Sequence, residues 1–152
     1  MLTNFEIMPQ AKSRVNFFFL DSKPTLKNRE TLKDFLISIF KKERKYLGSI
    51  TYIFTDDKNV LEINKKYLNH NFLTDIITFD LAERHQPITA EVYISTERVK
   101  ENANAHKTTF KKELHRVIFH GALHLCGYND KTSPQVAKMR RKEDFYISEY
   151  FK

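Results

Sequence analysis

The stretch from Val117 to Asp130 constrains this chain more than any other part of the sequence. Its apolar run from Val117 to Cys126 predicts a helix, and His120 and His124 are four positions apart within it. Because four positions are about one helical turn, both imidazoles project from the same face of the predicted helix. Two ring nitrogens on one face can share a single metal ion, so the stretch predicts a metal-binding helix.

A glycine and a carboxylate follow the two histidines. Gly127 stands where a helix commonly ends in a left-handed residue, and a chain reversal there would bring Asp130 under the two rings. Three protein ligands with an open position for water are typical of catalytic zinc sites. A histidine pair alone is more often surface or core decoration than a ligand pair, so the prediction depends on all three residues together.

The position after His120 separates this stretch from the zinc proteases. Those enzymes have a long motif whose third ligand lies six positions after the second histidine, as Asp130 lies six after His124. They also place a glutamate general base directly after the first histidine, where this chain has Gly121. Glycine has no side chain to accept a proton, so the sequence predicts a metal site that lacks the peptidase base.

The charge of the chain favours a polyanionic partner. The 152 residues carry a net charge of +7, and nucleic acid is the commonest partner of such a basic protein. A basic surface that is merely solvated is the alternative. The single cysteine excludes an intrachain disulfide. Neither a secretory signal nor a membrane-spanning apolar run is evident, so we expect a cytoplasmic protein with no membrane partner.

Hydrophobic periodicity predicts strands mixed with helices early in the chain and helices alone after them. The predicted strands are 15–20, 49–55, 75–81 and 88–95. The predicted helices with clear ranges are 28–47, 97–106 and 109–126, and the first of these is expected to stop at Gly48. A short helix through Val60 and Tyr67 is expected to be capped by Asp56 or Asp57, and a last helix is expected to start with Ser133 as its cap. This order predicts an α+β (mixed α/β) fold with one small mixed sheet packed with helices, and residues 1–152 are expected to form a single domain.

Three stretches together resemble the YbeY family of rRNA maturation factors. Residues 120–130, HGALHLCGYND, resemble the family signature H-G-x-L-H-L-x-G-Y-D-H. Residues 73–79, LTDIITF, resemble its P-T-D-V-L-S-F segment, and residues 90–94, AEVYI, are similar to its G-D-I-x-I strand. The stretches occur in the family's order and with its gaps.

The resemblance implies a metal-dependent endoribonuclease specific for single-stranded RNA, with one zinc ion, or another divalent metal, per chain. It places the metal ligands at His120, His124 and Asp130. It also implies a metal-binding helix similar to that of zincin-type metal hydrolases. The implied roles are 16S rRNA 3′-end maturation and ribosome quality control, with rRNA and the small ribosomal subunit as partners in the cytoplasm.

Two positions depart from the family pattern. Asp130 stands where the usual third ligand is histidine, but a carboxylate binds zinc at about the same distance as imidazole, whereas the amide of Asn129 is a poor ligand. Leu68 stands where the family usually has an arginine thought to help bind or cleave RNA, which puts that phosphate contact in doubt. His70 or a nearby lysine could replace the arginine, and we take His70 and Thr74 as the substrate-binding candidates.

Asp75 and Glu113 are the candidates for a catalytic proton acceptor. Asp75 could orient a metal-binding histidine, or it could cap the start of its strand. Glu113 lies on the same predicted helical face as the histidine pair, although an ion pair with Arg116 or a lysine is the commoner role for such a residue. Cys126 lies on another face of that helix, which favours core packing.

Two other functions remain alternatives to the nuclease. A ribosome-associated assembly factor with a structural metal would be consistent with the absence of the arginine at Leu68. A metallopeptidase would be consistent with the histidine spacing, but Gly121 argues against it.

Overall fold

A computed structural model describes residues 12–152. Its strands are β1 (Arg14–Phe19), β2 (Leu47–Thr55), β3 (Ile76–Asp80) and β4 (Ile88–Ser95), and its helices are α2 (Arg29–Lys42), α3 (Asp57–Leu68), α4 (Thr96–Ala105), α5 (Phe110–Leu125) and α6 (Ser133–Tyr150). One four-stranded sheet has the order β1-β2-β4-β3, with β3 antiparallel to β4 and the other neighbours parallel. The predicted α+β fold with a single mixed sheet is confirmed. Residues 1–11 are outside the described part, so the single domain over 1–152 stays a prediction.

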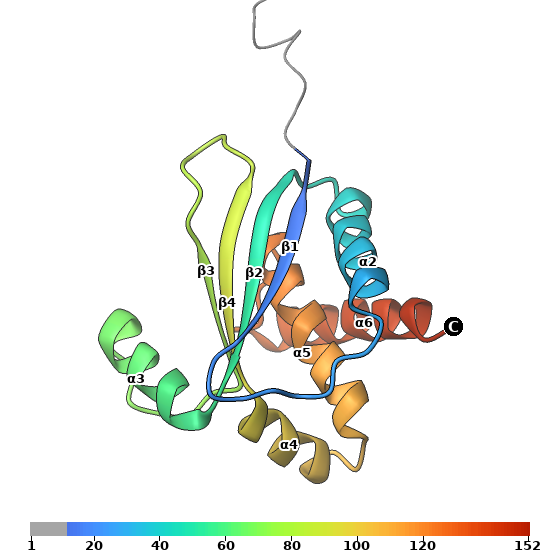
Figure 1. Ribbon diagram of the computed structural model, residues 1–152. Helices are drawn as coiled ribbons and strands as arrows, with labels where there is room; N and C mark the ends of the chain where they lie inside the picture. The colour runs from blue at the N-terminus through green and yellow to red at the C-terminus, as the bar shows by residue number, and fades with distance from the viewer. Residues whose placement is uncertain (1–11) are drawn as a thin grey trace, which may run out of the picture.

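The core lies between the sheet and the helices behind it. Figure 1 shows α5 crossing behind the sheet, with α2 beside it and α6 beyond. The hydroxyl of Tyr52, at the centre of β2, donates a 2.9 Å hydrogen bond to the backbone oxygen of Ile118 and so joins the sheet to α5. The fully buried residues of α2, β2 and α5 include Leu32, Leu36, Ile39, Phe40, Ile50, Phe54, Leu114 and Phe119.

Gly121 lets α5 lie close to the sheet. A Cβ atom at this position would be 2.9 Å from Cδ1 of Ile76 on β3 and 3.1 Å from Cγ1 of Val92 on β4. The first distance is shorter than real Cβ contacts and the second is tighter than most, so even alanine would require the side chains of Ile76 and Val92 to shift. The histidine-bearing helix therefore owes its depth in the fold to a missing side chain.

Two predicted helix boundaries are wrong. Helix α2 ends at Lys42, several residues before its predicted end, because the chain turns through Arg44 in the left-handed conformation with φ of 58°. Gly48, the predicted stop, lies inside β2. Helix α6 is capped by Thr132 rather than by Ser133, and Thr132 forms a capping box with the third residue of the helix.

The start of α3 is fixed by two adjacent aspartates. Asp56 is the capping residue, and its side chain accepts a 2.9 Å hydrogen bond from the backbone nitrogen of Asn59. Asp57 joins α3 to α4, because its two carboxylate oxygens accept hydrogen bonds from Ser95 and Arg98, each at 2.7 Å. Burial would raise the pKa of Asp57, but these two partners hold it below its usual value.

Among the helices of residues 12–152, none combines the length and the apolar character that a membrane-spanning helix needs.

Candidate metal centre

The two histidines lie side by side on α5, as the spacing predicts. Their ring centroids are 4.5 Å apart, and both side chains are partly exposed on the same face of the helix. Helix α5 ends at Leu125, and Gly127 follows with φ of 102°, a conformation that favours glycine. The chain reverses at this glycine and runs back beneath the helix.

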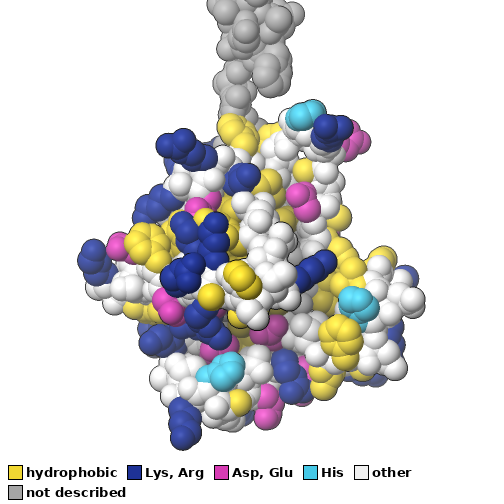
Figure 2. All heavy atoms as spheres, turned by 180° about the vertical axis from the view of Figure 1, so that it is seen from behind, with side chains coloured by type: hydrophobic (Ala, Val, Ile, Leu, Met, Phe, Trp, Pro, Cys, Tyr) yellow, Lys and Arg dark blue, Asp and Glu magenta, His cyan; other side chains and the backbone are white. Residues whose placement is uncertain are grey.

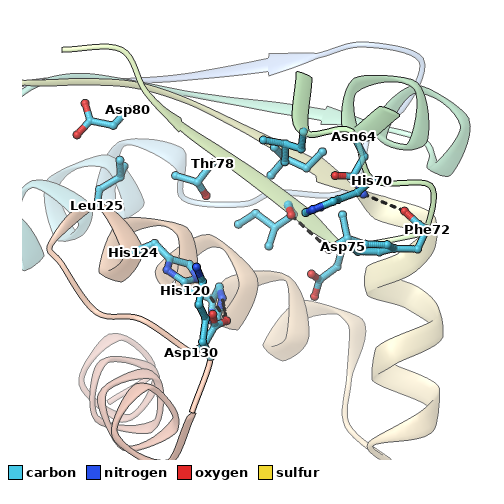
Figure 3. Close-up of a pocket in the computed structure, with 15 residues that line it drawn as sticks. Asn64, His70, Phe72, Asp75, Thr78, Asp80, His120, His124, Leu125 and Asp130 are labelled. Atoms are coloured by element: carbon cyan, nitrogen blue, oxygen red, sulfur yellow. Dashed lines mark hydrogen bonds and ion pairs between the residues drawn. The ribbon is translucent and has the colours of Figure 1, made fainter. Parts of the chain in front are cut away.

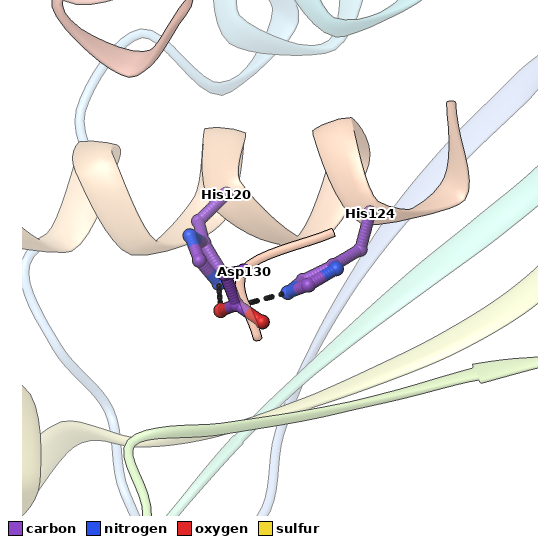
Figure 4. A group of neighbouring side chains, drawn as sticks. All are labelled: His120, His124 and Asp130. Carbon is purple, nitrogen blue, oxygen red and sulfur yellow. Dashed lines mark ion pairs between the residues drawn. The ribbon is translucent and has the colours of Figure 1, made fainter. Parts of the chain in front are cut away.

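Asp130 arrives from this reversal and completes a group of three donors. Its Oδ2 atom lies 3.3 Å from Nε2 of His120 and 3.3 Å from Nε2 of His124, and Figure 4 shows the carboxylate facing both rings. Zinc ligands at about 2.0–2.1 Å in tetrahedral geometry are separated from one another by roughly 3.3–3.4 Å. Two imidazole nitrogens and a carboxylate oxygen are ordinary zinc donors, so the three residues fit a zinc ion.

Glu143 holds the ring of His120 from α6. Its Oε2 atom lies 2.6 Å from Nδ1 of His120, and its carboxyl group also pairs with Arg116 at 3.2 Å. When Nδ1 donates its hydrogen to this carboxylate, Nε2 keeps its lone pair and points it at the donor group with Asp130. Burial would lower the pKa of His120, but Glu143, Asp130 and Asp75 together raise it above its usual value.

Glu143 is the residue that reading the sequence for ligand spacings missed. It lies 23 positions after His120, so no ligand spacing connects the two residues. A signal was nonetheless present, because Glu143 lies four positions from both Met139 and Ile147 on the apolar stripe of α6. A carboxylate on a buried stripe requires partners, and here the partners are His120 and two arginines, Arg116 and Arg140.

The loop that delivers Asp130 is fixed by a second set of polar contacts. The hydroxyl of Tyr128 donates a 2.9 Å hydrogen bond to Oε1 of Glu43, which follows the last residue of α2. Lys142 on α6 pairs with the same oxygen at 2.8 Å. The side chain of Glu43 is only 8% exposed, whereas Tyr128 and Lys142 are partly exposed, so the carboxylate lies on the inner side of this junction of α2, α6 and the loop.

A cleft of about 660 Å³ opens over the three donors. Figure 3 shows them on one wall, with the strand β3 and the 69–74 loop, which joins α3 to β3, on the other. The substrate-binding candidates His70 and Thr74 both line the cleft, as does Leu68, the departure from the family arginine. Its other lining residues include Asn64, Phe72, Asp75, Thr78, Asp80 and Lys131.

Asp75 lies in the cleft but does not hold a histidine. Its Oδ2 atom accepts a 3.1 Å hydrogen bond from Asn102 of α4, and its backbone oxygen accepts one from the nitrogen of Ser95 at 2.9 Å. Burial raises the pKa of Asp75 above its usual value, against the opposing charge of His120. The histidine-orienting contact that was one interpretation of Asp75 is made by Glu143 instead.

Glu113, the other catalytic candidate, lies away from the cleft. It is buried in the first turn of α5 and is not among the residues that line the cavity. The sequence predicted an ion pair of Glu113 with Arg116 or a lysine, but Arg116 pairs with Glu143 and with Asp144, the latter at 2.8 Å, and residues 12–152 show no ion pair of Glu113. Cys126 is buried in the core, as predicted.

A small α+β fold that holds two histidines and a carboxylate at the edge of a cleft is typical of metal-dependent hydrolases. Comparison with known proteins narrows this class. Residues 19–151 match the model of the family described as Endoribonuclease YbeY. The chain belongs to the YbeY family, which confirms the resemblance and the predicted class of enzyme, an endoribonuclease.

Individual relatives agree with the family model. Endoribonuclease YbeY of Cytophaga hutchinsonii is 43% identical over 90% of this chain and 96% of its own length. The protein of the same name from Christiangramia forsetii is 42% identical over 90% of this chain and 94% of its own. The solution structure of TM1509 from Thermotoga maritima has a TM-score of 0.58 and 26% sequence identity, covering 91% of this chain and 89% of that protein.

Proposed function

We propose that this protein is an endoribonuclease that uses one zinc ion, or another divalent metal ion, per chain to cleave single-stranded RNA. The observation that carries the proposal is the convergence of His120, His124 and Asp130, whose three donor atoms lie within 4.8 Å of one another at the cleft. When bound there, zinc supplies Lewis-acid chemistry, because it polarises a phosphoryl oxygen and makes water acidic enough to attack at neutral pH.

The protein's own residues divide the remaining tasks. Glu143 keeps His120 in the tautomer and orientation that direct Nε2 toward Asp130. Asp75 is the better candidate for holding a proton during the reaction, because it lines the cleft and its pKa is raised, whereas Glu113 is remote from the cavity. A carboxyl group in the cleft whose pKa is raised by burial holds a proton more readily than an ordinary aspartate does.

The cleft offers few charges to an RNA phosphate. Lys131 is the one lysine or arginine among the residues that line it, and it directly follows the ligand Asp130. Leu68 occupies the position of the family arginine at the opposite wall. We therefore assign Lys131, with His70 and Thr74, to substrate binding, and we expect slow turnover in the absence of the arginine.

Membership in the YbeY family supports a biological role that goes with this chemistry. We infer that the substrate is rRNA in the small ribosomal subunit, that the reaction serves 16S rRNA 3′-end maturation and ribosome quality control, and that the protein works in the cytoplasm. The net charge of +7 supports a partner rich in phosphate.

The deciding experiment is cleavage of a defined single-stranded rRNA fragment by highly purified protein, metal-loaded or treated with chelator. Wild type should cut the fragment only when loaded, and His124→Ala should be inactive. His106→Ala is the matched control, because His106 is an exposed histidine beyond the end of α4, and it should cut like wild type.

Equal cleavage by wild type and His124→Ala would contradict the proposal, since the nuclease would then be a contaminant. Retained RNA binding in that case would favour the ribosome-associated assembly factor, with which the apolar Leu68 is also consistent. A metallopeptidase is disfavoured because Gly121 supplies no base, and we expect no cleavage of casein.

A further inference from the structure

We propose that the 69–74 loop is a nucleobase-stacking subsite, in which unpaired bases of single-stranded RNA lie against the rings of His70 and Phe72. The inference rests on the proposed function for its choice of RNA, and it adds a subsite with its own chemistry. The two rings are stacked with their centroids 5.0 Å apart and an interplanar angle of 23°. Both line the cleft that contains the three metal-site donors.

The exposed ring of Phe72 is a candidate surface for binding a ligand. Its side chain is 56% exposed although the ring is large and apolar, and one of its faces is already taken by His70. The outer face of such a stacked pair is the surface on which a planar base can continue the stack. Leu68, which is 41% exposed and lines the same cleft, extends this apolar wall.

The loop is held in place although its rings are exposed. Asn64 is buried in α3, and its side-chain nitrogen donates a 3.0 Å hydrogen bond to the backbone oxygen of Phe72. The backbone nitrogen of His70 donates to the backbone oxygen of Asn64 at 3.1 Å. Asn69 closes α3 in the left-handed conformation with φ of 55°. A platform fixed before binding loses little conformational freedom when a ligand arrives.

The charges of the cleft favour a base over a phosphate at this wall. Asp75 and Asp80 both line the cavity near β3 and would repel a phosphate there. Lys65 and Lys66 are in the last turn of α3, which directly precedes the loop, and Lys131 lines the cleft beside Asp130. Figure 2, the view from behind, shows Lys and Arg side chains spread over that face among uncharged and hydrophobic ones. The arrangement fits an RNA strand whose backbone follows the three lysines while its bases face the rings.

The test compares two oligonucleotides of about ten nucleotides, a length within the range of single-strand binding sites. One is a single-stranded RNA without self-complementarity, and the other has the same ribose-phosphate backbone without bases. Affinity is measured by fluorescence anisotropy, and a gel of the recovered oligonucleotide verifies that it is intact. The variants are Phe72→Ala, Phe72→Trp and, as a matched control, Phe18→Ala. Phe18 is 57% exposed on β1, at the opposite edge of the sheet.

We expect Phe72→Ala to weaken binding of the RNA by roughly 5- to 150-fold, the range typical of losing one base–aromatic stack. Its affinity for the abasic chain should equal that of wild type, because the charges are unchanged. Phe72→Trp should retain base-dependent binding, and Phe18→Ala should behave as wild type. Equal losses on both oligonucleotides, or no loss on either, would overturn the inference.

Failure of this subsite is distinguishable from failure of the proposed function. If wild type cleaves RNA in a His124-dependent way while Phe72→Ala binds RNA as wild type does, only the stacking subsite is refuted. If base-dependent binding requires Phe72 but cleavage is the same in His124→Ala, only the nuclease is refuted. If wild type binds neither oligonucleotide, the stacking subsite is refuted, and the nuclease is decided by the cleavage experiment alone.

Discussion

The carboxylate of Glu143 lies 2.6 Å from Nδ1 of His120 and joins the last helix to the metal-site helix. This contact fixes which nitrogen of the ring is free and where it points. Burial of the Glu143 side chain, which is 7% exposed, keeps competing water away from the contact. The donor group is therefore assembled by α5, α6 and the turn between them.

Glu143→Gln should lower metal affinity by about 10- to 100-fold, the usual cost of losing a partner that orients a ligand. A competitive chelator titration measures the effect. Asp144→Asn is the matched control, because Asp144 also pairs with Arg116 but has no contact with either histidine among its ion pairs. Equal metal affinity in the two variants would mean that Glu143 pairs with Arg116 but does not orient His120.

Replacing each proposed ligand should empty the site. His120→Ala, His124→Ala and Asp130→Ala should each lose bound metal, because two remaining donors hold zinc poorly, whereas Asp130→His should keep it. Asn129→Ala is the control for the loop and should also keep it. Elemental analysis of the purified variants decides the matter, and metal loss in Asn129→Ala together with retention in Asp130→Ala would show that the third ligand is misassigned.

Leu68→Arg should raise the rate of RNA cleavage by roughly 10-fold or more without changing the metal content, because it adds a cation at the wall of the cleft. Lys131→Ala should lower the rate by a similar factor. Single-turnover kinetics with metal-loaded protein measure both. An unchanged rate in Leu68→Arg would mean that residue 68 does not approach the reacting phosphate.

Gly121→Glu should destabilise the protein by about 3 kcal/mol or more, because the new side chain would be forced between α5 and the sheet with a buried charge. The Cβ of any side chain at this position would meet Cδ1 of Ile76 and Cγ1 of Val92. Thermal unfolding measures the loss, with Lys112→Glu on the exposed side of α5 as control. A variant with unchanged Tm would show that the helix can move away from the sheet.

The contacts of Asp57 predict a pH-dependent stability. Since its pKa is held below the usual value in the folded protein, the stabilisation is present above the unfolded pKa of about 3.9 and is lost as the pH falls through the folded value. Asp57→Asn should therefore cost about 1–2 kcal/mol at pH 7, and the difference from wild type should narrow as the pH falls below about 5. Urea unfolding at several pH values tests this, with the exposed Asp34→Asn as control. A difference that is constant with pH would assign the effect to packing.

The sequence predicted well those features that depend on short spacings. The histidine pair, the turn at Gly127 and the placement of Asp130 are all set within a few residues, and the structure brings them together. The strands and the order of the helices follow from local periodicity in the same way. The end of α2 was mispredicted because glycine is only the commonest left-handed residue, and Arg44 takes that conformation here.

The features that the sequence left open depend on tertiary contacts. Glu143 could be recognised as unusual on an apolar stripe, but only the packing of α6 on α5 shows that its partner is His120. The sequence pattern could not decide whether Asp75 orients a metal-binding histidine or caps the start of its strand. From the sequence, Gly121 indicated only that the peptidase base is missing. Its close packing against β3 and β4 could not be predicted, because it depends on how closely the helix lies against the sheet.

The junction of Glu43, Tyr128 and Lys142 joins segments that are made at very different times during synthesis of the chain. During synthesis, His120 and His124 are made before the turn that carries Asp130, and Lys142 and Glu143 are made later still. Until α6 docks, the turn lacks its tether to α2 and His120 lacks its orienting carboxylate. All four strands of the sheet precede the Asp130 turn and α6 in the sequence, since β4 ends at Ser95. We therefore expect that a chain ending before α6 would have all four strands of the sheet but neither the contact that orients His120 nor the tether of the Asp130 turn.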